Sequence, residues 1–399
     1  MRRQTDRQTG RSNLRLTRKR AFTLVELLVV IVVIGILFAV LISRVDFAGD
    51  KAKTTGAMTD LRSYQLALQT IATKEGLITS DVNMLARTLN SNLDSALAVS
   101  VVDEKIVSDR TDPWGTPYNI EIFEDRAYLY SAGKDSKFKT NNDVIAFVRV
   151  DKSNGLPNVV LGSCSDTSKY EYNLETASWS DIAMASEDGF AAMIYNIGDV
   201  KIVNDCWTVQ IAGFDHDNLS DGSGKAGITF TTCETSDYEY WMNQSTGGYS
   251  SGRNLGGWAE TEMRSLLNGT YYDTLPSDLK SVIKSVDKIS DNGCELNAAS
   301  TTLITTSDQL WLLSAEEVGL CRDYTVYTRR GQGAVYPLYS SNQDRLIDCF
   351  INDNHYNGEY WLRSSRDTYH FNFYTVGETG KAGSAVAESY KVVAPGFCI

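Results

Sequence analysis

Between residues 22 and 42 the chain is almost entirely apolar: only Thr23 and Glu26 are polar, and proline is absent. A helix rises about 1.5 Å per residue, so a run of this length matches the roughly 30 Å hydrocarbon core of a bilayer. The pattern therefore predicts one transmembrane helix, which we place at residues 22–44. A cleaved secretory signal peptide is the alternative. Such a peptide has a shorter apolar core followed by a small-residue cleavage site, whereas here the small residue, Ala21, comes before the apolar run.

After the apolar run, hydrophobic residues recur at spacings of three and four, the pattern of an amphipathic helix. This spacing predicts that the helix continues to about residue 74. Alternating hydrophobic and polar positions between 111 and 150 predict short antiparallel strands. The helical stripe consists of Ala57, Met58, Leu61, Tyr64, Leu68, Ile71 and Ala72.

These patterns predict an α+β fold. We expect a long N-terminal transmembrane helix that packs on a small antiparallel sheet, followed by a separate α+β domain. Between them lies a polar, turn-rich stretch that predicts a linker. The expected parts are a basic leader at 1–21, the transmembrane helix at 22–44, a stem helix and head at 45–150, the linker at 151–184 and the distal domain at 185–399.

The charge of the chain is divided unevenly. Residues 1–20 carry a net charge of +7, and the rest of the chain carries −19. Because phosphate binding needs clustered Lys and Arg, an acidic body argues against nucleic acid as a partner. Positive charge on one flank of a membrane helix marks its cytoplasmic side, so we expect a single-pass membrane protein whose bulk lies outside the cytoplasm.

The segment "RKRAFTLVELLVVIVVIGIL" resembles the N-terminal segment of type IV pilins and type II secretion pseudopilins. The resemblance implies that a prepilin peptidase cuts between Ala21 and Phe22 and methylates the new amine. Glu26 then becomes the fifth residue of the mature chain. A buried carboxylate is tolerated when a cation pairs with it, and the amine of a neighbouring pilin subunit supplies one, so we expect Glu26 to set register during filament assembly. The other implied partner is the inner-membrane assembly machinery.

The head is also similar to the major pseudopilin of type II secretion, since it contains "DPWGTPY" at residues 112–118. In that family a loop after this motif binds calcium. Transferred to this chain, the resemblance implies carboxylate ligands from Asp135 and Asp143, completed by Asn142 and carbonyl groups near Ser131. An ordinary polar hairpin is the alternative, because the loop has few acids for a site that needs several converging oxygens.

The distal domain contains the motifs "GGWAETEMRSLLNG", "TSDQLWLLSAEEVG" and the terminal "VVAPGFCI". The set is similar to an uncharacterised module found at the ends of bacterial surface and phage tail proteins. Its helices and its late "WLRS" strand also resemble the C-type-lectin-like fold shared by some adhesins and by formylglycine-generating enzymes. Residues 336–374 are rich in Tyr, Asn, Asp, Ser and His, a mixture typical of binding surfaces. Alternation there predicts a strand whose solvent face carries His370, Asn372 and Tyr374, as a site for a glycan or protein ligand. Edge-strand residues without a binding role are the alternative.

The seven cysteines all follow residue 163, which allows disulfides in the distal domain, although an odd number leaves one unpaired. None forms a CxxC pair, so the sequence argues against a zinc site.

Three functions compete. The first is a minor pilin, or pseudopilin, whose distal domain binds or adheres outside the cell. The second is a scaffold subunit of a secretion or DNA-uptake pseudopilus. The third is a surface-tethered enzyme with a formylglycine-generating-enzyme-like fold. We expect the first and no enzymatic activity, because no catalytic motif surrounds the histidines of the chain. These are His216, His355 and His370.

Overall fold

The computed structural model divides the chain into two units, residues 1–55 and Gly56–Ile399. For residues 24, 26, 38–48, 151, 322 and 351 the structure describes the backbone but not the side chain. The residues that the structure describes are 24–75, 78–79, 81–123, 125–151, 158–236, 238–244, 253–293, 302–322, 326, 328–351, 354–367 and 369–399.

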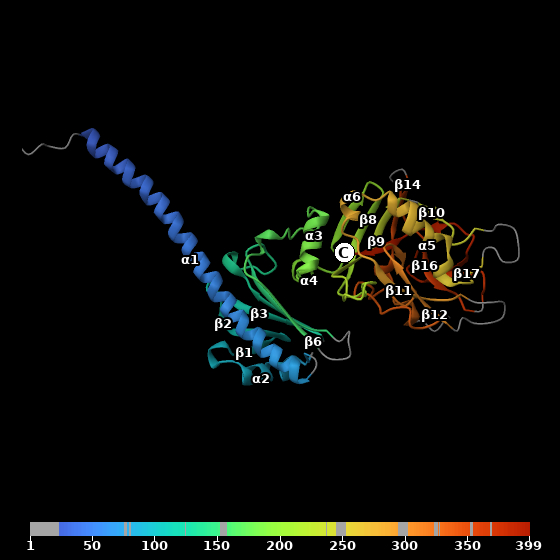
Figure 1. The fold of residues 1–399 in the computed structure, drawn as a ribbon, viewed down its shortest axis with the longest axis horizontal. Helices are drawn as coiled ribbons and strands as arrows, with labels where there is room; N and C mark the ends of the chain where they lie inside the picture. The colour runs from blue at the N-terminus through green and yellow to red at the C-terminus, as the bar shows by residue number, and fades with distance from the viewer. Residues whose placement is uncertain are drawn as a thin grey trace, which may run out of the picture. The chain divides into compact units, whose positions relative to one another are not determined.

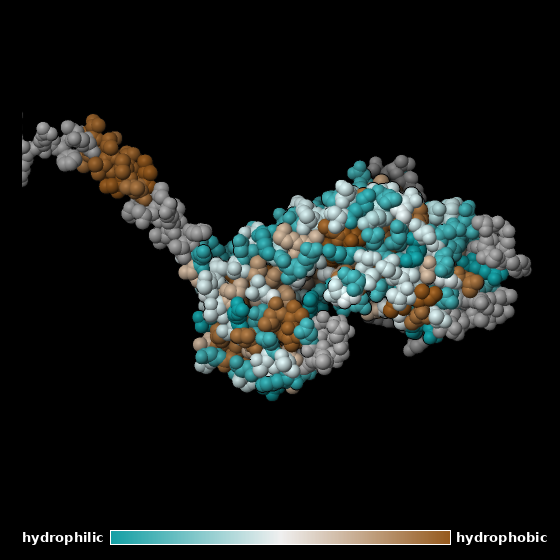
Figure 2. Space-filling view, in the orientation of Figure 1, coloured by the Kyte–Doolittle hydropathy of each residue, from teal (hydrophilic) through white to brown (hydrophobic). Residues whose placement is uncertain are grey.

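The first helix, α1 (Leu24–Glu75), is 52 residues long (Figure 1). In its N-terminal part the described side chains are apolar and exposed, from Val25 at 68% to Leu37 at 56% (Figure 2). Within the described residues, however, no helix is both long enough and apolar enough to cross a membrane. Residues 22 and 23 of the predicted transmembrane segment lie outside the described part of the chain.

The C-terminal part of α1 buries the predicted stripe. Ala57, Leu61, Tyr64 and Leu68 are completely buried in a core formed with a neighbouring sheet and the short helix α2 (Val82–Asn92). The prediction of an amphipathic helix that packs on a small antiparallel sheet is therefore confirmed. Asp81 caps the N-terminus of α2: its carboxylate accepts hydrogen bonds from two backbone amides of the first turn.

The sheet beside α1 has six strands in chain order, and every neighbouring pair is antiparallel. Sequential antiparallel pairing needs only short connections, so local patterns carry most of its information. Its strands are β1 (Val99–Val102), β2 (Lys105–Thr111), β3 (Pro117–Ile122), β4 (Arg126–Ser131), β5 (Val144–Asp151) and β6 (Asn158–Cys164).

The prediction of a linker at 151–184 is wrong for the described residues of that stretch. β6 pairs along its whole length with β5, and α3 (Trp179–Glu187) begins before residue 184. The six-stranded head sheet also packs directly on the segment that follows α3. Phe147 of β5 and Phe190 are both buried, and their ring centroids are 5.4 Å apart. The two regions therefore share one hydrophobic core.

The remainder of the chain contains a seven-stranded and a five-stranded sheet, with a two-stranded ribbon, so the α+β class is confirmed. In the larger sheet the path is β13-β20-β9-β14-β15, with β8 paired to β9 and β7 to β8. In the smaller sheet the order is β10-β19-β16-β17-β18. The larger sheet contains β7 (Val200–Asn204), β8 (Trp207–Phe214), β9 (Ile228–Ser236), β13 (Trp311–Leu312), β14 (Asp348–Ile351), β15 (Asn354–Asn357) and β20 (Pro395–Cys398).

The remaining elements are short. The ribbon pairs β11 (Val286–Asp291) with β12 (Leu303–Asp308). The smaller sheet contains β10 (Glu239–Tyr240), β16 (Tyr360–Ser365), β17 (Asn372–Val376), β18 (Ala382–Val386) and β19 (Lys391–Val392). The helices are α4 (Ala191–Ile194), α5 (Glu262–Leu266) and α6 (Ser277–Lys280), with a π-helical turn at Leu267–Tyr271. Cys164, Cys206, Cys233, Cys321 and Cys398 are free thiols, and Cys294 lies outside the described residues.

Two cations and two anions, contributed by β11, β16 and two connecting segments, form a buried cluster. The Lys288 ammonium lies 2.5 Å from Asp217 and 3.0 Å from Glu317. The Arg363 guanidinium binds Glu317 through two nitrogens, at 2.5 and 2.9 Å. All four side chains are at most 5% exposed. Burial alone would raise the pKa of Glu317, but the charges of Arg363 and Lys288 hold it below the usual value.

We predict that Glu317→Gln destabilises the protein by about 3–5 kcal/mol, because two buried cations are left with one anion. The measurement is urea unfolding of the full-length chain, purified in detergent and followed by tryptophan fluorescence. Glu378→Gln, at an exposed position, is the matched control and should change stability by less than about 0.5 kcal/mol. A loss for Glu317→Gln no larger than that of the control would show that the cluster does not hold the fold.

Candidate functional site

The predicted processing and assembly residues lie at the N-terminal end of the chain. Ala21 and Phe22 are outside the described residues. Glu26 lies within α1, but its side chain is not described. The cut between Ala21 and Phe22 and the pairing of Glu26 with a neighbouring amine therefore stay predictions.

The loop between β4 and β5 brings three of the four predicted calcium-binding residues together. Thr140 Oγ1 lies 3.0 Å from a carboxylate oxygen of Asp143 and 3.4 Å from one of Asp135, so both carboxylates approach the same hydroxyl group. Asn142 Oδ1 accepts a hydrogen bond from the Asp135 amide at 3.4 Å. Asp143 is buried, and this burial raises its pKa to about 6. The loop thus gathers oxygen atoms of the kind that calcium prefers.

Carbonyl groups near Ser131 stay predicted ligands, while the Ser131 side chain contacts a different group. Its hydroxyl donates a hydrogen bond of 2.6 Å to Asp112. The other carboxylate oxygen of Asp112 accepts hydrogen bonds from the amides of Trp114 and Thr116. The aspartate of the "DPWG" motif therefore closes its own turn and ties that turn to the end of β4, a role that the sequence did not reveal.

The predicted ligand-binding face of residues 367–374 is wrong at Tyr374. This side chain is 3% exposed, and its neighbour Phe373 is completely buried. The reason is that β17 lies inside the five-stranded sheet, and its two faces are covered by different hydrophobic clusters. A strand buried on both sides carries no solvent face.

The other two residues of that predicted site belong to a turn and to the first position of β17. The Asn372 amide donates to the Tyr369 carbonyl at 2.8 Å, which closes a turn that contains His370. Both side chains are partly exposed. A ligand-binding role for His370 and Asn372 therefore stays a prediction.

An aromatic row that the sequence analysis did not single out includes residues of the seven-stranded and the five-stranded sheets. It begins at Trp207 of β8, whose ring centroid lies 6.1 Å from that of Tyr271. The following centroid distances are 6.0 Å to Tyr238, 6.4 Å to Tyr240, 4.2 Å to Trp241 and 5.1 Å to Tyr390. Tyr238 is 39% exposed and Tyr390 is 54% exposed. We call these six residues the aromatic row.

One end of the aromatic row opens into a small pocket. Its volume is about 180 Å³ and its walls include Trp207, Tyr238 and Tyr271. Polar groups of Asn204, Thr235 and Ser236 line the same pocket. Aromatic walls with a few polar groups are typical of small-ligand sites, so this is the candidate binding surface of the C-terminal half.

Two family models match the chain. The first is described as a prokaryotic N-terminal methylation motif and covers residues 16–42. The second is described as a domain of unknown function, DUF6273, and covers residues 233–399. Most of the aromatic row therefore lies within the second match, while Trp207 precedes it.

A curated relative matches part of the chain. It is the type II secretion system core protein G of Pseudomonas aeruginosa, with 31% identity over 128 residues. The match covers 29% of this chain and 84% of the relative. No solved structure matches the chain. The methylation motif and this relative together establish that the chain belongs to the type IV pilin and type II secretion pseudopilin family.

Proposed function

We propose that the protein is a minor pilin or pseudopilin subunit of a type IV pilus or type II secretion-like filament. In this proposal the C-terminal half is displayed outside the cell as a binding and adhesion domain. The methylation motif at 16–42 carries the proposal, because it lies at the start of a 52-residue helix whose far end packs on a small antiparallel sheet. The large C-terminal half is bulky for a densely packed major subunit, which favours a minor one.

In this proposal the residues around 22–44 anchor the chain in the membrane, with the basic leader in the cytoplasm. Prepilin peptidase removes the leader before Phe22, and the inner-membrane machinery then inserts the subunit among other pilins. A carboxylate in this apolar environment costs roughly 2.5–3.5 kcal/mol when unpaired. The amine of the adjacent subunit removes that cost by pairing with Glu26, so correct packing is favoured over other registers.

The proposed ligand of the displayed half is a carbohydrate, and its site is the aromatic row with its pocket. The flat rings of Tyr238 and Tyr240 are nearly parallel, with an interplanar angle of 11°. Parallel rigid rings offer flat apolar area to the apolar faces of sugar rings, and they lose little conformational entropy on binding. The proposal assigns no enzymatic reaction to the chain.

Calcium is the proposed cofactor of the head. Asp135, Asn142 and Asp143 would supply its protein ligands, with backbone carbonyl groups of the same loop. The oxygen-rich chemistry of the loop and the approach of both carboxylates to Thr140 support this assignment. Bound calcium would neutralise the buried Asp143 carboxylate and stiffen the link between β4 and β5.

For the assembly step, we predict that Glu26→Ala leaves peptidase cleavage intact but prevents entry into filaments, because no carboxylate then pairs with the neighbouring amine. Mass spectrometry of the mature N-terminus and quantification of subunits in sheared filaments measure the two steps. Glu75→Ala, at the exposed end of α1, is the matched control and should assemble normally. Mature protein that still begins at Met1, or normal assembly of Glu26→Ala, would refute the proposal.

For the loop between β4 and β5, we predict that about 10 mM calcium stabilises the protein by about 1–3 kcal/mol at neutral pH, where Asp143 is charged. The melting temperature of full-length protein in detergent should rise accordingly. The shift should disappear in Asp135→Ala and persist in Asp287→Ala, which changes an exposed aspartate of β11. An equal shift in both variants, or none in the unchanged protein, would leave the loop as a polar hairpin.

For the C-terminal half, we predict that the Tyr238→Ala, Tyr390→Ala double variant binds glycans at least about tenfold more weakly, since two exposed rings are lost. Full-length protein on a glycan array measures this binding. The comparison variant is His370→Ala, Asn372→Ala, which alters the surface expected from the sequence. Binding that is lost only in the comparison variant would move the site to the turn before β17.

A further inference from the structure

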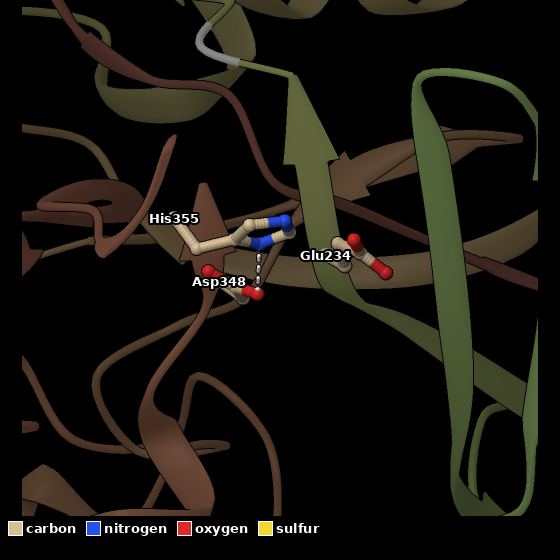
Figure 3. A group of neighbouring side chains, drawn as sticks. All are labelled: Glu234, Asp348 and His355. Atoms are coloured by element: carbon tan, nitrogen blue, oxygen red, sulfur yellow. Dashed lines mark hydrogen bonds and ion pairs between the residues drawn. The ribbon is translucent and has the colours of Figure 1, made fainter. Parts of the chain in front are cut away.

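Three strands of the seven-stranded sheet bring two carboxylates and an imidazole together. Glu234 lies on β9, Asp348 begins β14 and His355 lies on β15. β14 is the middle strand of the three: Asp348 pairs with Glu234 in parallel register, and β15 pairs with β14 in antiparallel register. Figure 3 shows the carboxylates of Asp348 and Glu234 on the same side of the sheet as the imidazole of His355.

The distances fit a metal ion after small side-chain rotations. One ligand atom from each residue lies within 4.8 Å of the others. His355 Nδ1 and Asp348 Oδ2 are already 2.6 Å apart. Zinc binds nitrogen and oxygen at about 2.0–2.2 Å, which places two tetrahedral ligands about 3.4 Å apart. The aspartate–histidine pair must therefore open by about 0.8 Å, and Glu234 must move inward by up to about 1.4 Å.

The charge around this group favours a cation. Among the described residues, no Lys or Arg forms an ion pair with Glu234 or Asp348, and the Glu234 carboxylate has no hydrogen-bond partner. A divalent cation would neutralise both carboxylates at once.

We infer that Glu234, Asp348 and His355 form a zinc site with open coordination positions. An imidazole ligand favours zinc over calcium or magnesium, which take oxygen ligands. Three protein ligands leave at least one position of a tetrahedral ion for water or an incoming donor group. The side chains of His355 and Asp348 are 52% and 45% exposed, so such a donor can reach the ion. The site is independent of the pilin assignment, because it uses only residues of the C-terminal half.

Cysteine spacing could not predict this site, because its ligands are two carboxylates and a histidine. They also lie up to 121 positions apart in the sequence, from Glu234 to His355. Only the parallel pairing of β9 with β14 brings them together.

The test is isothermal titration of full-length, EDTA-treated protein in detergent with zinc sulfate. We expect one zinc ion per chain and a loss of affinity of about 100-fold or more in both Glu234→Gln and His355→Ala. Glu234→Gln keeps the aspartate–histidine pair and nearly the same side-chain volume, so its unfolding midpoint in urea should stay close to that of the unchanged protein. His370→Ala is the matched control and should bind zinc normally.

A second control addresses Cys206, an exposed free cysteine whose thiol is of a type that zinc binds. Cys206→Ser should leave zinc binding unchanged. Absence of zinc binding by the unchanged protein would overturn the inference. So would binding that survives Glu234→Gln and His355→Ala but disappears in Cys206→Ser.

Discussion

The buried cluster of Lys288, Glu317, Arg363 and Asp217 is the constraint on which the C-terminal half depends. Its members come from β11, β16 and two connecting segments. Moving charged groups from water into a protein interior costs several kcal/mol each unless partners and hydrogen bonds replace the water. Here each cation contacts an anion within 3.0 Å. Any packing that displaces one segment leaves an unpaired charge in the core, so the cluster selects one arrangement of these segments.

This selection reaches the candidate binding surface. Arg363 belongs to the five-stranded sheet, whereas Asp217 precedes β9 of the seven-stranded sheet. The aromatic row uses the same two sheets, since Trp207 lies on β8 and Tyr240 on β10. A row of rings whose spacing is fixed in advance binds a ligand at a lower ordering cost. By joining the two sheets, the cluster fixes the positions of the strands that carry these rings.

The fold was predictable where its information is local. Ala57, Leu61, Tyr64 and Leu68 repeat at helical spacing, and the core that they form follows from that spacing alone. β6 was missed because it is a short edge strand between turn-rich polar stretches, and its pairing with β5 defines it. The mistake at Tyr374 has a similar origin. Alternation predicts two faces of a strand, but it cannot reveal that a second hydrophobic cluster covers the outer face.

The absence of a free linker changes how the two halves work together. Arg126 and Arg149 of the head sheet both pair with Asp215, and Phe147 packs on Phe190 in a shared core. Asp215 is only 15% exposed, so these ion pairs are poorly screened by solvent. The head and the C-terminal half therefore form one packed unit from Gly56 to Ile399. In a filament, the orientation of the head would then set the orientation of the displayed surface, and a pull on a bound ligand would pass into the filament without first extending a tether.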